Sequence, residues 1–336
     1  MAEQEKLPGL QIARAIAALT VAYEHSWHVT MPFPEGTSYL IAFIGRLPAV
    51  PFFFAISGFV ICMIAVKPNF QPLPFLVRRV FRIYPLWIVT TLVFLVLCRI
   101  ALGYPERHSL GFFAYSLTLL PTEGYPFYNV GWSLQHEIAF YALATMMVPR
   151  FGLWGLSAFL CAGTIADHIF TLPWYLHQYA TYYPDFLAGI AAFATSRYLR
   201  SFGFWIPFAA GVGMLIIFMA SITNLAYSPA IFLLLVGFLN IRFGAFIIKR
   251  AGVLLGDASY SIYLIHPLVF YFVYAMLRHP LPPVWTQEFL RFGSIAIVCA
   301  ISIVSWKLFE TPIIRIGNRL MNRSHIPNQI YQPSES

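Results

Sequence analysis

Long apolar runs alternate with short polar connections along most of this sequence. The runs approach the length of about 20 residues that an α-helix needs to cross the hydrocarbon core of a membrane. The pattern therefore predicts an all-α, polytopic integral membrane protein with about ten transmembrane helices. The predicted spans are residues 10–29, 46–66, 80–101, 131–149, 152–170, 180–196, 203–221, 228–243, 255–277 and 289–310.

The composition supports a membrane protein. Hydrophobic residues make up 59% of the 336 residues and charged residues only 10%, whereas soluble domains have about 45–50% and about 25%. This excludes a soluble globular or disordered chain and leaves no room for a sizeable water-soluble domain. We therefore expect one transmembrane domain, residues 1–312, followed by a cytoplasmic tail, residues 313–336. The first apolar run lacks a small-residue cleavage site and is expected to be a retained span.

Basic residues are distributed unequally between the two predicted sides of the membrane. Fifteen Lys and Arg residues fall on one side and five on the other. Because cytoplasmic loops carry an excess of Lys and Arg, this asymmetry predicts that both termini are cytoplasmic. The same bias explains the net charge of +8, so no nucleic-acid partner is expected.

The four cysteines are far apart in apolar runs and are expected to be free thiols: Cys62, Cys98, Cys161 and Cys299. A metal site at Glu24, His25 and His28 has suitable helical spacing but no further indicated ligands. We therefore expect no metal.

The first predicted span carries three ionisable residues. Arg14 and His25 are eleven residues apart, nearly three helical turns, so they share one face about 16 Å apart along the axis. Glu24 lies directly beside His25. Ionisable groups inside a span are costly and suggest function, which is the favoured reading for His25. For Arg14, a side chain that reaches the membrane surface is an equally good explanation.

Two later spans also carry charge. Arg79 and Arg82 are spaced i, i+3 at the start of a predicted span, and two guanidiniums on one face suit a phosphate group. Anchoring by the positive-inside bias is the alternative. Glu137 lies about one turn into an apolar span and shares a face with Ser133. A carboxylate at that depth needs a partner or a water-filled cavity, so Glu137 is a candidate functional residue.

Three further positions have features of a binding site. Ser57 and Gly58 lie within an apolar span, where small side chains allow a neighbouring helix or a thin ligand to approach. His266 lies near the middle of the span 255–277 and is followed by Pro267, which favours a helix kink. Packing is the alternative explanation for each of these positions.

These residues form a series of short motifs. The motifs are Arg14 and His25 with ten residues between them, FFxxSG at Phe53 to Gly58, RxxR at Arg79 and Arg82, WSLxxE at Trp132 to Glu137, and SYSIYLIHP at Ser259 to Pro267. Together and in this order they resemble the integral-membrane acyltransferase-3 family, the multi-span O-acyltransferases of bacterial surface sugars. The resemblance extends from about Leu7 to Pro312, and is closest to the stand-alone exopolysaccharide acetyltransferases.

The resemblance implies a multi-pass protein of the bacterial inner membrane. It would transfer an acyl group, most often acetyl, from a coenzyme A thioester to a hydroxyl of a surface polysaccharide or its lipid-linked precursor. The residues expected to bind the acyl-CoA are Arg14, Ser57, Gly58, Arg79 and Arg82. Those expected to bind the acceptor are Trp132, Ser133 and His266.

His25 is the expected general base, since a neutral imidazole accepts a hydroxyl proton near pH 7. Glu24 and Glu137 complete the expected catalytic set, and either one could orient the imidazole or bind the acceptor. A covalent acyl-histidine intermediate is an open alternative, and transfer could occur on either face of the membrane.

A secondary transporter or flippase for a lipid-linked sugar is the rival function. Such a protein would also place Arg, Glu and His in the membrane interior. It would further predict corresponding broken helices in two related halves, and no such internal symmetry is evident in the sequence. A scaffold without activity would leave the costly Arg14, His25 and Glu137 unexplained.

Overall fold

The protein is described by a computed structural model. It describes residues 7–30, 43–68, 70–102, 109–220, 227–241, 246–277 and 284–323, and within these ranges all regular secondary structure is helical. The prediction of an all-α fold is confirmed. The α-helices are α1 (Pro8–His25), α3 (Ala49–Ala65), α4 (Pro72–Leu97), α5 (Leu110–Leu117), α6 (Gly131–Ile169), α7 (Trp174–Ala180), α8 (Tyr183–Leu199), α9 (Trp205–Met219), α10 (Tyr227–Leu239), α11 (Phe246–Asp257), α12 (Ser259–Leu277), α13 (Val284–Ser305) and α14 (Thr311–Arg323).

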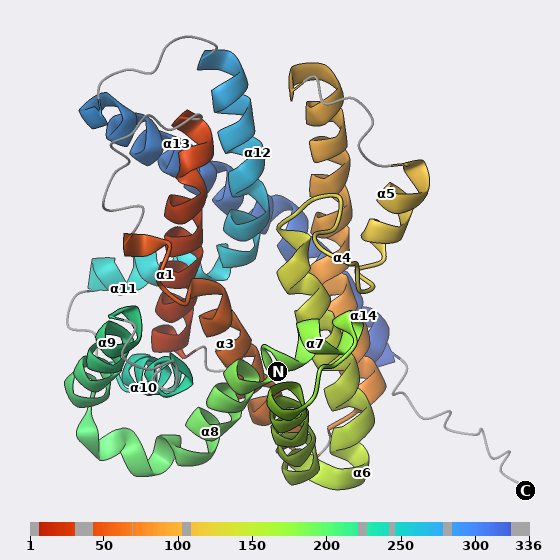
Figure 1. The fold of residues 1–336 in the computed structure, drawn as a ribbon, viewed down its shortest axis with the longest axis vertical. Helices are drawn as coiled ribbons and strands as arrows, with labels where there is room; N and C mark the ends of the chain where they lie inside the picture. Colours follow the sequence, from red (N-terminus) through yellow and green to blue (C-terminus); the bar gives the residue numbers. More distant parts are fainter. Residues whose placement is uncertain are drawn as a thin grey trace, which may run out of the picture.

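Helix α1 packs among α3, α10, α11, α12 and α13, in the left half of the view in Figure 1. Helix α4 contacts α6, α12 and α14, and helices α8, α9 and α10 pack together near one end of the molecule. Pro8 opens α1 at a position where a proline costs no hydrogen bond. A short 3-10 helix, Ser26–Thr30, follows directly, so that His25 is the last residue of α1.

Four helices in the described part of the chain are long and apolar enough to cross a membrane: Pro72–Ile100, Gly131–Ile169, Ser259–Met276 and Thr286–Met321. A fifth candidate is the pair Trp174–Phe202 and Trp205–Met219, which is bent by 119°. The predicted total of ten spans is therefore not confirmed, because several predicted spans form helices shorter than 18 residues. Helix α4 exposes an apolar stripe that includes Ile88, Leu92 and Val96, which suits contact with lipid.

Helix α6 is broken at Gly152. This glycine has φ +65° and ψ −171°, which no helix contains and which residues with a Cβ atom rarely adopt. Pro149 lies just before the break and removes a backbone donor. The break lies beside the predicted connection between spans 131–149 and 152–170.

Two predicted boundaries near the C-terminal end need correction. Residues 255–277, predicted as one span, belong to two helices, α11 and α12, with Ala258 between them. The last predicted span does not end the helical structure at residue 310. A π-helical turn, Trp306–Glu310, leads into α14, which packs on α4 and lies in the region predicted as a tail. Residues 324–336 lie outside the described residues.

Helices α3 and α8 cross at a pair of glycines. A Cβ atom on Gly58 would lie 2.2 Å from the carbonyl oxygen of Phe186, and one on Gly189 would lie 1.8 Å from that of Ala55. Any side chain at either position would therefore force the two backbones apart. Gly58 was expected to help bind acyl-CoA, but the structure places it at this crossing, where small residues permit close helix packing.

Candidate functional site

Six of the residues singled out from the sequence line a single cavity between α1, α3, α4, α6 and α12. They are Arg14, Ser57, Arg79, Arg82, Ser133 and Glu137. We call this space, which has an empty volume of about 700 Å³, the basic cavity. The chain folds in this way because each of these residues interrupts an otherwise apolar helix, and a polar group at membrane depth must face the protein interior or a cavity.

Three arginines dominate the electrostatics of the basic cavity. Arg79 is only 8% exposed, and its guanidinium carbon lies 4.9 Å from the ring centre of Tyr141 and 5.1 Å from that of Phe75. In the described part of the chain, the guanidiniums of Arg14, Arg79 and Arg82 make no hydrogen bond and no ion pair. Cation–π contact compensates a buried guanidinium only in part, so the cavity is suited to an anion.

The carboxylate of Glu137 is held by two hydroxyl groups. The Ser57 hydroxyl donates to Oε1 of Glu137 at 3.0 Å, and the Tyr141 hydroxyl donates to the same oxygen at 2.5 Å. Tyr141 follows Glu137 by one helical turn, so one face of α6 supplies both groups. Glu137 is therefore fixed inside the basic cavity, and His25 is not among its hydrogen-bond partners.

Tyrosines of α12 tie this helix to the rest of the cavity wall. The Tyr263 hydroxyl lies 2.7 Å from Oγ of Ser133 and 2.9 Å from the carbonyl oxygen of Val130. The Tyr260 hydroxyl donates to the carbonyl oxygen of Ile83 in α4 at 2.6 Å. Ser133 thus lines the cavity as predicted, but its hydroxyl is already engaged by Tyr263.

His25 is paired with His266. Nδ1 of His25 lies 2.8 Å from Nε2 of His266, and the two rings are stacked with centres 5.1 Å apart. Nδ1 of His266 lies 3.1 Å from the carbonyl oxygen of Ile262. A carbonyl oxygen only accepts, so Nδ1 of His266 carries the proton, and Nε2 of its neutral ring accepts from Nδ1 of His25. Neutral His25 consequently has its lone pair on Nε2.

This arrangement changes the expected roles of three residues. Neither Glu24 nor Glu137 contacts Nδ1 of His25, because His266 occupies that position. His266 is completely buried, so its placement does not support a direct contact with the acceptor. Its ring centre lies 5.9 Å from that of Tyr263, which lines the basic cavity. The histidine pair is therefore one ring away from the cavity wall.

Glu24 and Trp132 belong to a second, more open cavity. They line it together with Asp185, and Val50 lines both this cavity and the basic cavity. Glu24 and His25, although adjacent in sequence, therefore face different surroundings. The structure does not bring all predicted catalytic residues into one cluster, and His25 is not among the lining residues of either cavity.

Sequence reasoning missed three polar groups that belong to this region. Tyr141 holds Glu137, and its position one turn beyond Glu137 could have indicated this. Glu310, only 5% exposed, accepts a hydrogen bond from Ser261 and lies within electrostatic range of Arg82. Asp185 lies in the first turn of α8, inside a predicted span. The cost of burying an ionisable group, which pointed to Glu137, could have pointed to Asp185 and Glu310 as well.

All four cysteines are free thiols, as predicted. Within the described ranges, no group of three or more His, Cys, Asp or Glu side chains is arranged to hold a metal ion.

Comparison with known proteins gives the family of the chain. The model of the acyltransferase domain of the acyltransferase-3 family matches residues 7–306. The chain is also similar to the exopolysaccharide production protein ExoZ of Rhizobium meliloti (strain 1021), with 25% identity over 300 residues that cover 80% of this chain and 89% of the relative. No solved structure matches. Six of the motif residues line the basic cavity, and the family match over nearly the whole chain establishes that this protein belongs to the acyltransferase-3 family.

Proposed function

We propose that this protein transfers an acyl group, most often acetyl, from acyl-CoA to a hydroxyl of an exopolysaccharide or its lipid-linked precursor. The observation that carries the proposal is that Arg14, Arg79 and Arg82 line one cavity of a protein of the acyltransferase-3 family. In the described part of the chain, none of the three has an ion-pair partner. The name of the relative, an exopolysaccharide production protein, supports this class of acceptor.

The basic cavity is suited to the polyanionic end of coenzyme A. Guanidiniums bind phosphate oxygens with paired hydrogen bonds, and they remain charged even when buried. Arg79 and Arg82 come from α4 and Arg14 comes from α1, so an anion bound between them would contact two helices. The pantetheine arm would then extend along α1 toward His25, a helical rise of about 16 Å.

His25 is the proposed general base. Its Nε2 atom accepts the proton of the acceptor hydroxyl as the hydroxyl oxygen attacks the thioester carbonyl carbon. The carbon–sulfur bond then breaks, and the coenzyme A thiolate takes the proton from the imidazolium. His266 holds Nδ1 of His25 throughout, which keeps the lone pair on the reacting nitrogen. In the acyl-histidine alternative, Nε2 first attacks the thioester carbonyl and the carbon–sulfur bond breaks, which releases the coenzyme A thiolate. The acceptor hydroxyl then attacks the acyl-imidazole, the carbon–nitrogen bond breaks, and the hydroxyl proton passes to the thiolate.

The proposed location is the bacterial inner membrane, with both termini and the basic cavity on the cytoplasmic side, where acyl-CoA is made. The excess of basic residues on one predicted side supports this orientation. Labelling of single cysteines introduced at exposed positions, Arg78 and Glu123, with a membrane-impermeant maleimide in intact cells would test it. In this orientation the cysteine at position 123 reacts with the maleimide and the cysteine at position 78 does not.

Acyl transfer by purified protein tests the proposed reaction. The assay combines labelled acetyl-CoA with host exopolysaccharide stripped of its ester groups, and it follows both thiol release and label on the polymer. We expect transfer by the wild type, a loss of about 10²- to 10⁴-fold in His25→Gln, and unchanged binding of coenzyme A in that variant.

Other results would contradict specific parts of the proposal. Full transfer by His25→Gln would exclude His25 as base and as nucleophile. A wild type that neither binds nor cleaves acetyl-CoA would contradict the donor assignment and favour transport of a lipid-linked sugar. Labelled protein that survives gel filtration after incubation without acceptor would identify the acyl-histidine route.

A further inference from the structure

The second cavity has a different chemical character from the first. It lies where the end of α1 meets the first turns of α6, α8 and α10, and its empty volume is about 1740 Å³. We call it the acidic cavity after Glu24 and Asp185, which line it. Its other polar and aromatic lining residues include Arg46, Trp132, His168, Thr181, Tyr182, Tyr227 and Ser228. The proposed reaction assigns it no ligand, because the donor occupies the basic cavity.

Asp185 is the unusual group in this cavity. Asp185 is only 3% exposed, yet its carboxylate has no hydrogen bond or ion pair within the described ranges. Buried carboxylates in folded proteins are normally paired. Asp185 lies in the first turn of α8, where the helix dipole favours a negative charge but supplies only part of the missing stabilisation. A ligand that donates hydrogen bonds would complete it.

Glu24 repeats this situation in the same cavity. It is half-buried at the end of α1, it lines the same cavity, and its carboxylate is likewise unpartnered among the described residues. Two carboxyl groups without partners suit a ligand that offers hydroxyl donors rather than a phosphate, which has only acceptor oxygens for them, and this distinguishes the ligand of this cavity from that of the basic cavity. The absence of a third metal-ligating group in suitable geometry, within the described ranges, argues against a metal ion as the missing partner.

Aromatic rings supply the remaining surface. The ring centres of Trp132 and Tyr182 lie 5.4 Å apart, and Tyr227 faces the same space from α10. Tyr and Trp present a broad apolar face together with a polar edge. A pyranose ring has the matching features, namely a C–H face that packs on an aromatic ring and hydroxyl groups that donate hydrogen bonds to carboxylates.

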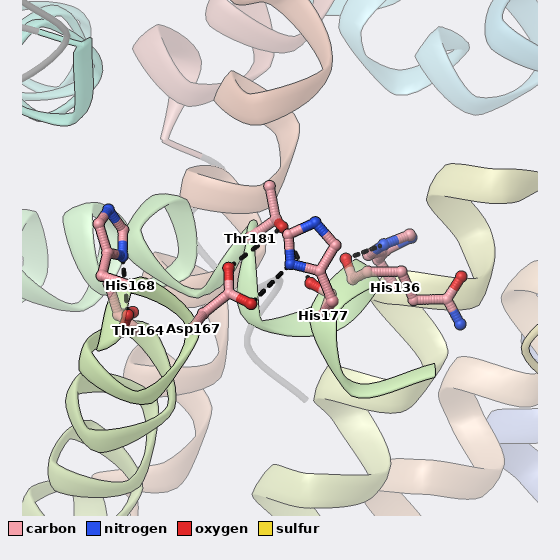
Figure 2. A network of polar contacts seen from close by, with 7 residues as sticks. His136, Thr164, Asp167, His168, His177 and Thr181 are labelled. Atoms are coloured by element: carbon pink, nitrogen blue, oxygen red, sulfur yellow. Dashed lines mark hydrogen bonds and ion pairs between the residues drawn. The ribbon is translucent and has the colours of Figure 1, made fainter. Parts of the chain in front are cut away.

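Polar contacts hold α7, the helix that precedes Tyr182 and Asp185 in the chain (Figure 2). Asp167, near the end of α6, accepts from the ring of His177 in α7 at 2.6 Å. His136, in the first turns of α6, lies 2.8 Å from the carbonyl oxygen of Gln178. Helix α7 is thus fixed at two points, and the chain from α7 leads directly into Tyr182 and Asp185. These contacts therefore fix the segment that carries two lining residues of the acidic cavity.

We propose that the acidic cavity binds a sugar unit of the acceptor, with Asp185 and Glu24 accepting hydrogen bonds from its hydroxyls and Trp132 and Tyr182 packing on its ring. The proposal rests on the proposed acyltransferase function for the identity of the sugar as an acceptor. It places the acceptor beside Glu24, the residue that precedes His25, and on the opposite side of Val50 from the donor.

Direct binding of a sugar ligand tests the proposal independently of catalysis. The probe is a fluorescently labelled oligosaccharide cut from de-esterified host exopolysaccharide, added to the protein in lipid nanodiscs. Loss of a hydrogen bond to a charged group reduces binding by about 10- to 100-fold. We expect Asp185→Asn and Glu24→Gln each to weaken binding by that factor, while the dissociation constant of coenzyme A changes less than two-fold. Glu123→Gln, an exposed carboxylate outside the cavity, is the matched control and should bind the probe like the wild type.

The possible results separate this proposal from the proposed function. Normal probe binding by both cavity variants overturns the proposed acceptor site. Displacement of the probe by phosphatidylethanolamine also overturns it, because the cavity would then bind a lipid headgroup. Wild-type protein that binds the probe but neither binds nor cleaves acetyl-CoA leaves the sugar site standing and contradicts the acyltransfer reaction. If Asp185→Asn does not fold, Trp132→Phe, which retains an aromatic ring against Tyr182, provides the second measurement, and its unchanged probe affinity also overturns the proposal.

Discussion

The side chains of His25 and His266 are 241 positions apart in sequence, and a 2.8 Å contact joins their rings. The contact crosses from the last residue of α1 to the middle of α12. His266 is fully buried and is itself oriented by the carbonyl oxygen of Ile262. The tautomer of His25 is therefore determined by a residue that does not line either cavity.

This pairing predicts a selective effect of His266 variants. His266→Phe removes the acceptor for Nδ1 of His25, so a fraction of His25 adopts the other tautomer, with no lone pair on Nε2. We expect kcat to fall by about 10- to 100-fold, as for other residues that orient a functional imidazole, while the KM values for donor and acceptor stay close to those of the wild type. His266→Gln restores an acceptor oxygen and should recover part of kcat. Equal losses in both variants would indicate a purely structural role.

The basic cavity predicts that Arg79 and Arg82 determine donor affinity. Removal of one charge-assisted contact costs about 1.5–3 kcal/mol, so Arg79→Gln and Arg82→Gln should each weaken coenzyme A binding by about 10- to 100-fold. The neighbouring Arg78 is exposed and does not line the cavity, and Arg78→Gln should leave the dissociation constant unchanged. Isothermal titration with coenzyme A and with dephospho-coenzyme A measures the effect and shows which arginine contacts the terminal phosphate. Equal weakening by all three variants would indicate only a general loss of positive charge.

The crossing of α3 and α8 predicts a loss of stability at Gly58. In Gly58→Ala the new methyl group meets the backbone of Phe186, and overpacking of this kind costs about 1–3 kcal/mol. We expect a lower melting temperature in detergent for this variant. A Cβ atom added to Gly213 in α9 would have no other atom within 4 Å, so Gly213→Ala should not lower the melting temperature. Equal melting temperatures for Gly58→Ala and Gly213→Ala would contradict the prediction, because α3 and α8 would then move apart without loss of stability.

The contact between Asp167 and His177 predicts local rather than global stabilisation. The side chain of His177 is 61% exposed, and pairs at such sites contribute about 1 kcal/mol or less. Asp167→Asn should therefore leave the melting temperature nearly unchanged while amide hydrogen exchange becomes faster in α7. His177→Ala should have the same effect, and the double variant should add nothing further. Additive effects would show that the two residues act separately.

The residues of the basic cavity could be predicted from the sequence because each of them is an expensive exception in an apolar helix. The cost of a charge at membrane depth favoured an inward position for Glu137, whereas the sequence alone left anchoring at the membrane surface open for Arg14 and Arg79. The contact between His25 and His266 could not be predicted in this way, because local sequence does not indicate which of the other helices packs against the end of α1. Helical spacing also could not reveal that α8 closes over Gly58, and a count of apolar residues could not locate the breaks at Gly152 and Ala258.

Val50, which lines both cavities, has a consequence for the membrane itself. Val50 lines both cavities, so in the proposed orientation, with the basic cavity on the cytoplasmic side, the residues around Val50 would separate the donor from the acceptor. An apolar constriction excludes water and ions even where it is only one side chain thick. The barrier would let a neutral acyl group reach the acceptor while the phosphates of the donor stay behind. In the proposed reaction, donor and acceptor would then meet at Val50 without a continuous path of water for protons.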